Sequence, residues 1–290
     1  MASFNRRKVK SRLAFPKMRR GIARPLLDAE TGVPLRPTLR RRGIYLLPNA
    51  FTTAALFCGF YAIVMAMNLK FDHASIAIFA AMLLDGIDGR VARLTNTQSE
   101  FGAQYDSLSD MVSFGAAPAL VVYEWSLRGL GKLGWLAAFV YCAGAALRLA
   151  RFNTNIAVVD KRYFQGLPSP AAAALVAGFI WLMDDLRFAG TDLGWISWTI
   201  TVFAGLTMVT NVPFYSFKDI NFRKSVPFIA IFLIVLGFVA VSSDPPKVFF
   251  GLFVTYGLSG YVIFFWRLFK GKPVSIIQTE IEPADDKDLH

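Results

Sequence analysis

Residues 85–110 read DGIDGRVARLTNTQSEFGAQYDSLSD, and four aspartates fall within this stretch although the sequence around it is strongly apolar. Asp85 and Asp88 are three residues apart, and Asp106 and Asp110 are four apart, so each pair shares one face of a helix. Ionised carboxylates in such surroundings are costly unless something neutralises them. Converging carboxylates are hard oxygen ligands that suit Mg²⁺, Mn²⁺ or Ca²⁺. The stretch therefore predicts two helices that meet around a divalent metal site rather than four unrelated helix caps.

The composition around this stretch indicates a membrane protein. Of 290 residues, 55% are hydrophobic and only 18% are charged, and 27 are phenylalanine. A soluble core of this size cannot bury so much apolar surface, so we predict an all-α, polytopic membrane helix bundle. The two histidines lie in a short loop and at the C-terminal residue, which argues against a zinc site or a histidine-based catalytic site.

Eight apolar stretches are candidates for membrane-spanning helices. They are residues 44–67, 71–95, 105–125, 134–152, 168–183, 196–212, 226–241 and 248–269. They divide the chain into a basic arm (1–43), a transmembrane catalytic domain (44–270) and a polar C-terminal tail (271–290). We expect the arm to be largely disordered or to lie at the membrane interface. No signal peptide is expected, because no apolar segment follows the basic start before Ile44.

The distribution of lysine and arginine orients these spans. Eight spans place both termini on one side, and the connections and flanks on that side are rich in basic residues: Arg41, Arg42, Arg90, Arg93, Lys161, Arg162, Lys218, Arg223, Lys224, Arg267, Lys270 and Lys272. The opposite side carries only Lys70, Arg128, Lys132, Arg187 and Lys247. By the positive-inside rule, both termini and the four aspartates lie on the cytoplasmic side.

The net charge of +11 is concentrated in the N-terminal arm. Its basic residues include Arg6, Arg7, Lys8, Lys10, Arg19, Arg20, Arg40, Arg41 and Arg42. Beside a membrane domain such a segment attracts anionic lipids, and we expect that role rather than nucleic-acid binding.

Eight positions in the stretch match the signature of a known family. Its pattern, D-x2-D-G-x2-A-R-x8-G-x3-D-x3-D, is that of the CDP-alcohol phosphatidyltransferases, and it is met without departure by Asp85, Asp88, Gly89, Ala92, Arg93, Gly102, Asp106 and Asp110. The resemblance implies an integral membrane enzyme with a CDP-linked lipid as donor. An alcohol hydroxyl attacks the lipid-side phosphate of this donor, and CMP leaves.

The resemblance also implies roles for the matching residues. Two divalent cations, Mg²⁺ or Mn²⁺, would be held by the first three aspartates and by Asp110, which would also be the general base for the attacking hydroxyl. The implied CDP-binding residues are Asp88, Gly89, Ala92, Arg93 and Gly102. In the first span, Pro48, Asn49 and Thr52 or Thr53 resemble the family's contacts to the nucleotide. For Asn49, a hydrogen bond between helices is an equal alternative.

Further stretches resemble one subgroup of the family, the bacterial membrane-integral phosphatidylserine synthases. They are residues 41–64, RRGIYLLPNAFTTAALFCGFYAIV; 148–155, RLARFNTN; 164–174, FQGLPSPAAAA; and 211–219, NVPFYSFKD. This implies CDP-diacylglycerol as donor, L-serine as acceptor, a homodimer, and a bacterial inner membrane location with the site facing the cytoplasm.

A serine acceptor needs a cation for its carboxylate. Arg148 and Arg151 are three residues apart near the end of one span and could supply it. The alternative is that they anchor the helix to anionic headgroups. Gln165, Ser169 and Lys218 are further candidates, although Ser169 could instead cap a helix.

Two other functions stay open. The acceptor could be a different alcohol, or the aspartates could form the path of a cation or proton transporter. A transporter would need polar residues across the third span, but Asp110 is followed by an apolar run that includes Val112, Phe114, Leu120 and Val121. A scaffold recruited through the basic arm would leave the aspartates unexplained.

Overall fold

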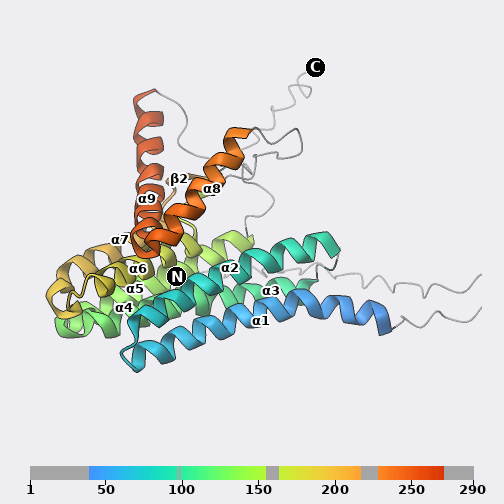
Figure 1. Ribbon diagram of the computed structural model, residues 1–290, viewed down its shortest axis with the longest axis horizontal. Coiled ribbons are helices and arrows are strands. Elements are labelled where there is room, and N and C mark those ends of the chain that lie inside the picture. Colours follow the sequence, from blue (N-terminus) through green and yellow to red (C-terminus); the bar gives the residue numbers. More distant parts are fainter. Residues whose placement is uncertain (1–38, 96, 98, 155–162, 217–227, 271–290) are drawn as a thin grey trace, which may run out of the picture. The chain divides into compact units, whose positions relative to one another are not determined.

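The computed structural model describes residues 39–95, 97, 99–154, 163–216 and 228–270. These residues are almost entirely helical (Figure 1). The helices are α1 (Leu39–Met67), α2 (Phe71–Thr95), α3 (Glu100–Asp110), α4 (Ala117–Trp125), α5 (Lys132–Thr154), α6 (Ser169–Asp185), α7 (Gly194–Val209), α8 (Phe228–Ser243) and α9 (Pro245–Phe269). A π-helical turn, Met111–Ala116, joins α3 to α4, and 3₁₀ turns occur at Leu127–Leu130 and Gly190–Leu193. All contacts discussed below lie within residues 43–290, one of two compact units of the chain.

Helix α6 forms the core of this unit. Every residue from Ala171 to Ile180 is buried, and the segment is rich in alanine with one glycine. Small side chains let neighbouring helices approach closely, which is how helices associate in membranes. Helices α2, α4, α7 and α9 all pack against α6. At one crossing, a Cβ added to Gly178 would lie 3.3 Å from the Phe250 backbone of α9.

Helices α5 and α7 are held together by a glycine pair. A Cβ added to Gly144 would lie 2.4 Å from the carbonyl oxygen of Gly205, and one added to Gly205 would lie 2.8 Å from Tyr141 Cα. The two backbones therefore touch, and no larger residue fits at either position. This contact fixes the part of α5 that leads to Arg148.

A short antiparallel ribbon departs from the all-α prediction. Strands β1 (Tyr163–Gln165) and β2 (Pro213–Tyr215) pair with Phe164 opposite Phe214. Gly166, which follows β1, has a φ of 74° that favours glycine, and a Cβ there would lie 2.4 Å from the Met208 carbonyl oxygen. Three-residue strands are too short to show an alternating pattern in the sequence, so only helices were expected here.

Four helices of the described residues are long and apolar enough to cross a membrane. They are Leu47–Met67, Lys132–Thr154, Gly190–Val209 and Pro245–Phe269. Helix α6 has 17 residues and α8 has 16, which is short for a hydrocarbon core about 30 Å thick. The prediction of a helical membrane protein is confirmed, whereas the number of eight spans and the side of the termini stay predictions. The basic arm up to residue 38 and the tail from 271 lie outside the described residues.

Candidate active site

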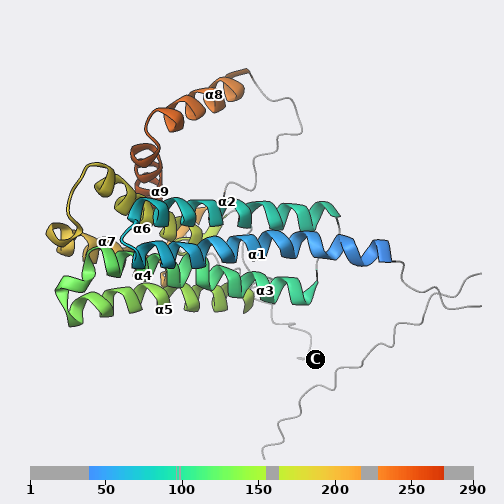
Figure 2. The same ribbon diagram turned by 60° about the horizontal axis from the view of Figure 1, so that its bottom comes forward.

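Helices α2 and α3 bring the two aspartate pairs together. The chain turns between Thr95 and Glu100, and the Ser99 side chain caps α3 by accepting a hydrogen bond of 3.0 Å from the Gly102 amide. Figures 1 and 2 show α1, α2 and α3 side by side. The predicted meeting of the end of one helix with the start of the next is therefore seen in the structure.

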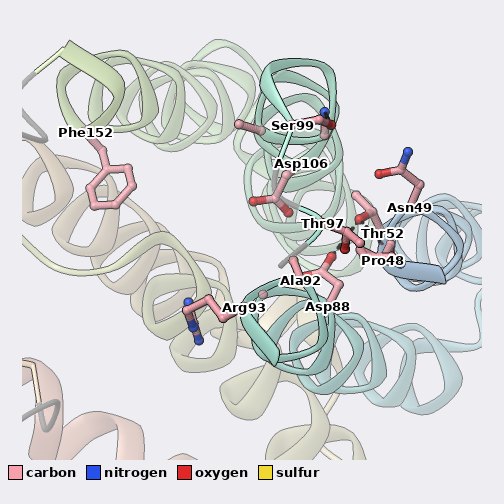
Figure 3. A pocket seen from close by; sticks show the side chains of 13 residues that line it. Pro48, Asn49, Thr52, Asp88, Ala92, Arg93, Thr97, Ser99, Asp106 and Phe152 are labelled. Carbon is pink, nitrogen blue, oxygen red and sulfur yellow. Dashed lines mark hydrogen bonds between the residues drawn. The ribbon is translucent and has the colours of Figure 1, made fainter. Parts of the chain in front are cut away.

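Three of the carboxylates form a tight cluster. Oxygen atoms of Asp85, Asp88 and Asp106 all lie within 4.8 Å of one another, a spacing that could hold a metal ion. Figure 3 shows Asp88 and Asp106 pointing toward each other from α2 and α3. Asp110, one turn further along α3, interacts electrostatically with Asp85 and Asp106. All four aspartates predicted as ligands thus lie at one place.

Helix α1 supports this cluster through hydroxyl groups. Thr52 is buried and donates to Asp88 Oδ2 at 2.8 Å, with the Pro48 carbonyl oxygen 3.1 Å away. Ser109 of α3 donates to the Thr52 carbonyl oxygen at 3.1 Å. Thr52 therefore connects α1 to both aspartate-bearing helices and fixes the orientation of the Asp88 carboxylate.

Replacing Thr52 with valine removes the hydroxyl while keeping the shape of the side chain. Loss of a hydrogen bond that orients a metal ligand typically weakens metal binding by about 10- to 100-fold. We therefore expect the Mn²⁺ concentration for half-saturation, followed by electron paramagnetic resonance, to rise by that factor. Thr255→Val is the matched control, because Thr255 is exposed and its hydroxyl donates to the Gly251 carbonyl oxygen of its own helix, α9. Equal Mn²⁺ affinity in the two variants would contradict this role of Thr52.

A cavity of about 470 Å³ opens beside the carboxylates. It is lined by most of the residues predicted to bind CDP, together with several new ones: Pro48, Asn49, Thr52, Asp88, Gly89, Ala92, Arg93, Thr97, Ser99, Gly102, Ala103, Asp106 and Phe152. In Figure 3, Thr52 and Asp88 lie on one side of it, and Arg93 and Phe152 lie on another. The cavity thus has acidic groups along one wall and a guanidinium and an aromatic ring along another.

Small residues keep this cavity open. A Cβ added to Gly102 would lie 3.1 Å from Ser99 Oγ and 3.4 Å from Asn49 Oδ1, so a side chain there would press on the wall. A Cβ added to Gly89 would lie 3.7 Å from Arg93 Nη1, at ordinary contact distance. Thr53, also predicted to bind CDP, does not line the cavity. Its hydroxyl donates to the Asn49 carbonyl oxygen at 2.7 Å and lies 2.9 Å from the Tyr105 hydroxyl.

Arg148 of α5 lies near the deep end of the cluster. It donates through Nη1 to Ser169 Oγ at 2.9 Å, and it interacts electrostatically with Asp110 and with the Tyr256 hydroxyl of α9. Its Nε is buried and has no hydrogen-bond partner among the described residues. A buried guanidinium with an unused donor is costly unless an anion completes its surroundings. Two of the predicted acceptor residues, Arg148 and Ser169, are thus hydrogen-bonded to each other, and Arg148 interacts with Asp110.

The other predicted acceptor residues are placed differently. Arg151 donates to Asn211 Oδ1 at 3.2 Å. Gln165 is part-buried in β1. Lys218 lies outside the described residues.

The sequence did not predict Thr97, Ser99 and Ala103 as cavity residues, and it also missed two residues on more distant helices. Phe152 lines the cavity and is 48% exposed, one helical turn after Arg148 on α5. Tyr256 approaches Arg148 from α9 and donates to the Tyr215 carbonyl oxygen of β2 at 3.1 Å. Helix spacing could have suggested Phe152, whereas nothing local in the sequence brings α9 to Arg148.

The carboxylate cluster fits a divalent metal. Asp106 Oδ1 is buried and has no hydrogen-bond partner among the described residues. The ion pairs in that part of the chain lie elsewhere, at Asp72, Glu124 and Asp244. Carboxylates this close repel one another unless a proton or a cation lies between them. Oxygen-only ligands favour Mg²⁺, Mn²⁺ or Ca²⁺ over zinc. The orphaned oxygen and the short spacing both indicate a cation site.

Comparison with known proteins identifies relatives over most of this domain. The sequence model of a family described as CDP-alcohol phosphatidyltransferase matches residues 45–210. The chain is similar to the CDP-diacylglycerol–serine O-phosphatidyltransferase of Helicobacter pylori (strain 26695), with 36% identity over 219 residues, which are 74% of this chain and 90% of the relative. The enzymes of the same name from Mycobacterium leprae (31% identity; 76% of this chain, 75% of the relative) and Saccharomyces cerevisiae (34%; 66% and 67%) are also similar.

Proposed function

Because the chain belongs to the CDP-alcohol phosphatidyltransferase family, we propose that it transfers the phosphatidyl group of CDP-diacylglycerol to the hydroxyl of L-serine, giving phosphatidylserine and CMP. The observation that carries this proposal is the joint placement of two features. The carboxylate cluster opens onto a nucleotide-sized cavity, and a buried guanidinium lies beside its deepest aspartate. Relatives that bear the name of this activity cover most of the chain and support the choice of serine.

The donor lies in the cavity with its diphosphate toward the carboxylate cluster. Arg93 contacts a phosphate, since its planar guanidinium matches phosphate geometry. Gly89 and Ala92 leave room on the surface of α2 for the base and the ribose. Asp85, Asp88 and Asp106 would hold divalent cations, with Asp110 as a further ligand. The Thr52 hydroxyl keeps Asp88 in place. When bound, Mg²⁺ or Mn²⁺ neutralises the diphosphate and stabilises the charge that develops on the leaving CMP.

Asp110 accepts the proton in the reaction. The serine hydroxyl oxygen forms a bond to the lipid-side phosphorus, and its proton passes to the Asp110 carboxylate. The bond from that phosphorus to the oxygen of CMP breaks, and CMP leaves with the electron pair. Arg148 binds the carboxylate of the substrate serine through Nε, while its Nη1 donates to Ser169 Oγ. The acceptor is thereby oriented with its hydroxyl toward Asp110.

The same proposal includes the arrangement in the membrane. Eight spans place both termini and the cavity at the cytoplasmic face of the bacterial inner membrane, in keeping with the excess of lysine and arginine on that side. Polar serine and the released CMP then exchange with the cytoplasm, while the acyl chains stay in the bilayer. The basic arm binds anionic lipids, and the active form is a homodimer, as the resemblance implies.

An acceptor screen on the purified protein tests the function. With CDP-diacylglycerol and Mg²⁺ or Mn²⁺ present, we expect CMP release with L-serine and none without a divalent ion. Glycerol 3-phosphate, inositol and choline are the comparison acceptors. CMP release with one of these but not with serine would refute the choice of acceptor, whereas release with none would refute the transferase itself.

A further inference from the structure

The π-helical turn that follows Asp110 has a cause in the sequence. In an α-helix the Phe114 carbonyl would accept from the amide of the residue four positions later, but that residue is Pro118, which has no N–H. The proline ring would also clash with this carbonyl. The helix widens instead, and the Ala117 amide donates to the Val112 carbonyl oxygen, five residues back. Pro118 therefore accounts for the wide turn and leaves the Phe114 carbonyl without its usual donor.

Tyr141 of α5 supplies the missing donor. Its side chain is completely buried, and its hydroxyl donates to the Phe114 carbonyl oxygen at 3.0 Å. Four residues further along α5, Ala145 packs against the π-helical turn. A Cβ added to Gly115 would lie 3.2 Å from Ala145 Cβ. An unpaired carbonyl in an apolar interior is costly, so this hydroxyl stabilises the wide turn specifically.

The wide turn reconciles two requirements on one continuous helix. Helix α4 is held in the core by buried Val121, Val122 and Trp125. Helix α3 must turn Asp106 and Asp110 toward α2. One residue of an α-helix corresponds to about 100° of rotation, so closing the wide turn would rotate α3 against α4 by roughly that angle. The aspartates could not then face Asp85 while α4 kept its place.

We infer that Tyr141 is a positioning residue for the reaction. Its hydroxyl holds the π-helical turn Met111–Ala116 in the form that places Asp110 against Asp85. The inference rests on the proposed function, in which Asp110 accepts the proton. Tyr141 is not among the residues that line the cavity, and its hydroxyl is engaged with the Phe114 carbonyl.

Tyr141→Phe removes only the hydroxyl. A displacement of a reacting group by about 1 Å can cost on the order of 100-fold in rate, so we expect kcat for CMP release to fall by roughly 10- to 100-fold. The KM for CDP-diacylglycerol should change much less, because Gly89, Ala92 and Arg93 line the cavity from α2 and keep their places. Tyr261→Phe is the control, since the Tyr261 hydroxyl pairs with Thr207 Oγ1 at 2.7 Å on α7. A kcat equal to that of the control would overturn the inference.

A second substitution tests the link through the Phe114 carbonyl. Pro118→Ala restores an amide that can donate to this oxygen and removes the cause of the wide turn, so this variant alone should lower kcat, and adding Tyr141→Phe should lower it little further. An equal loss in both backgrounds would show that Tyr141 acts by another route. This double-mutant cycle isolates the coupling between the two residues.

Hydrogen exchange supplies a measurement that does not depend on turnover. In Tyr141→Phe, the amides of residues 111–117 should exchange faster than in the unmodified protein, while those of residues 71–84 should not change. Unchanged exchange at 111–117 would overturn the inference even if the protein proved inactive with serine. Conversely, absent CMP release from the unmodified protein would count against the proposed function and leave the exchange result to decide on Tyr141.

Discussion

Asp110→Asn is expected to lower CMP release from CDP-diacylglycerol and serine by about 100- to 10,000-fold, the range that a general base contributes. Asparagine has nearly the same shape but cannot accept the hydroxyl proton. The cavity is lined by other residues, so binding of the CDP-lipid should be largely kept. The rate of CMP release and the equilibrium binding of CDP-diacylglycerol, measured on the same preparation, check both parts.

Asp192→Asn is the matched control for this variant. Asp192 is exposed in the 3₁₀ turn before α7, so the same chemical change there should leave the rate unaltered. If Asp110→Asn released CMP as fast as Asp192→Asn, Asp110 could not be the general base. If instead both the rate and CDP-lipid binding were lost, Asp110 would serve the donor site.

Arg148→Met is expected to act on serine rather than on the donor. A hydrogen bond to a charged group contributes about 1.5–3 kcal/mol, which corresponds to a rise of roughly 10- to 100-fold in the KM for serine. The KM for CDP-diacylglycerol should stay the same. The loss of the hydrogen bond from Nη1 to Ser169 Oγ should lower the thermal stability of the free protein, so the variant is compared at a temperature at which it stays folded.

Arg128→Met provides the comparison for Arg148. Arg128 is exposed and pairs with Glu124 at 2.6 Å, and such surface pairs contribute little. Its replacement should change neither KM. A rise in the KM for CDP-diacylglycerol in Arg148→Met, with serine unaffected, would move Arg148 to the donor side of the site.

The carboxylate cluster could be predicted because it depends mainly on local geometry. Helical spacing places Asp85 with Asp88 and Asp106 with Asp110, and a short connection between the helices then brings the pairs together. The same reasoning gave the cavity residues of α2, since they lie within two turns of the aspartates.

Features that depend on packing between distant segments could not be predicted. The choice of Thr52 over Thr53 as the residue facing the site depends on the rotation of α1 against α2. The approach of Tyr256 to Arg148 depends on the packing of α9 against α6. The π-helical turn had one local signal, Pro118 within an apolar helix, but its stabilising partner Tyr141 is 27 residues from Phe114 in the sequence.

The most direct test of the proposed reaction follows serine itself into the lipid. Purified protein is incubated with CDP-diacylglycerol, a divalent ion and isotopically labelled L-serine, and labelled lipid and CMP are quantified together. We predict that labelled phosphatidylserine and CMP form in equal amounts and that Asp110→Asn forms neither at a comparable rate. CMP release without label in the lipid would contradict the account, because the phosphatidyl group would then be passing to an acceptor other than serine.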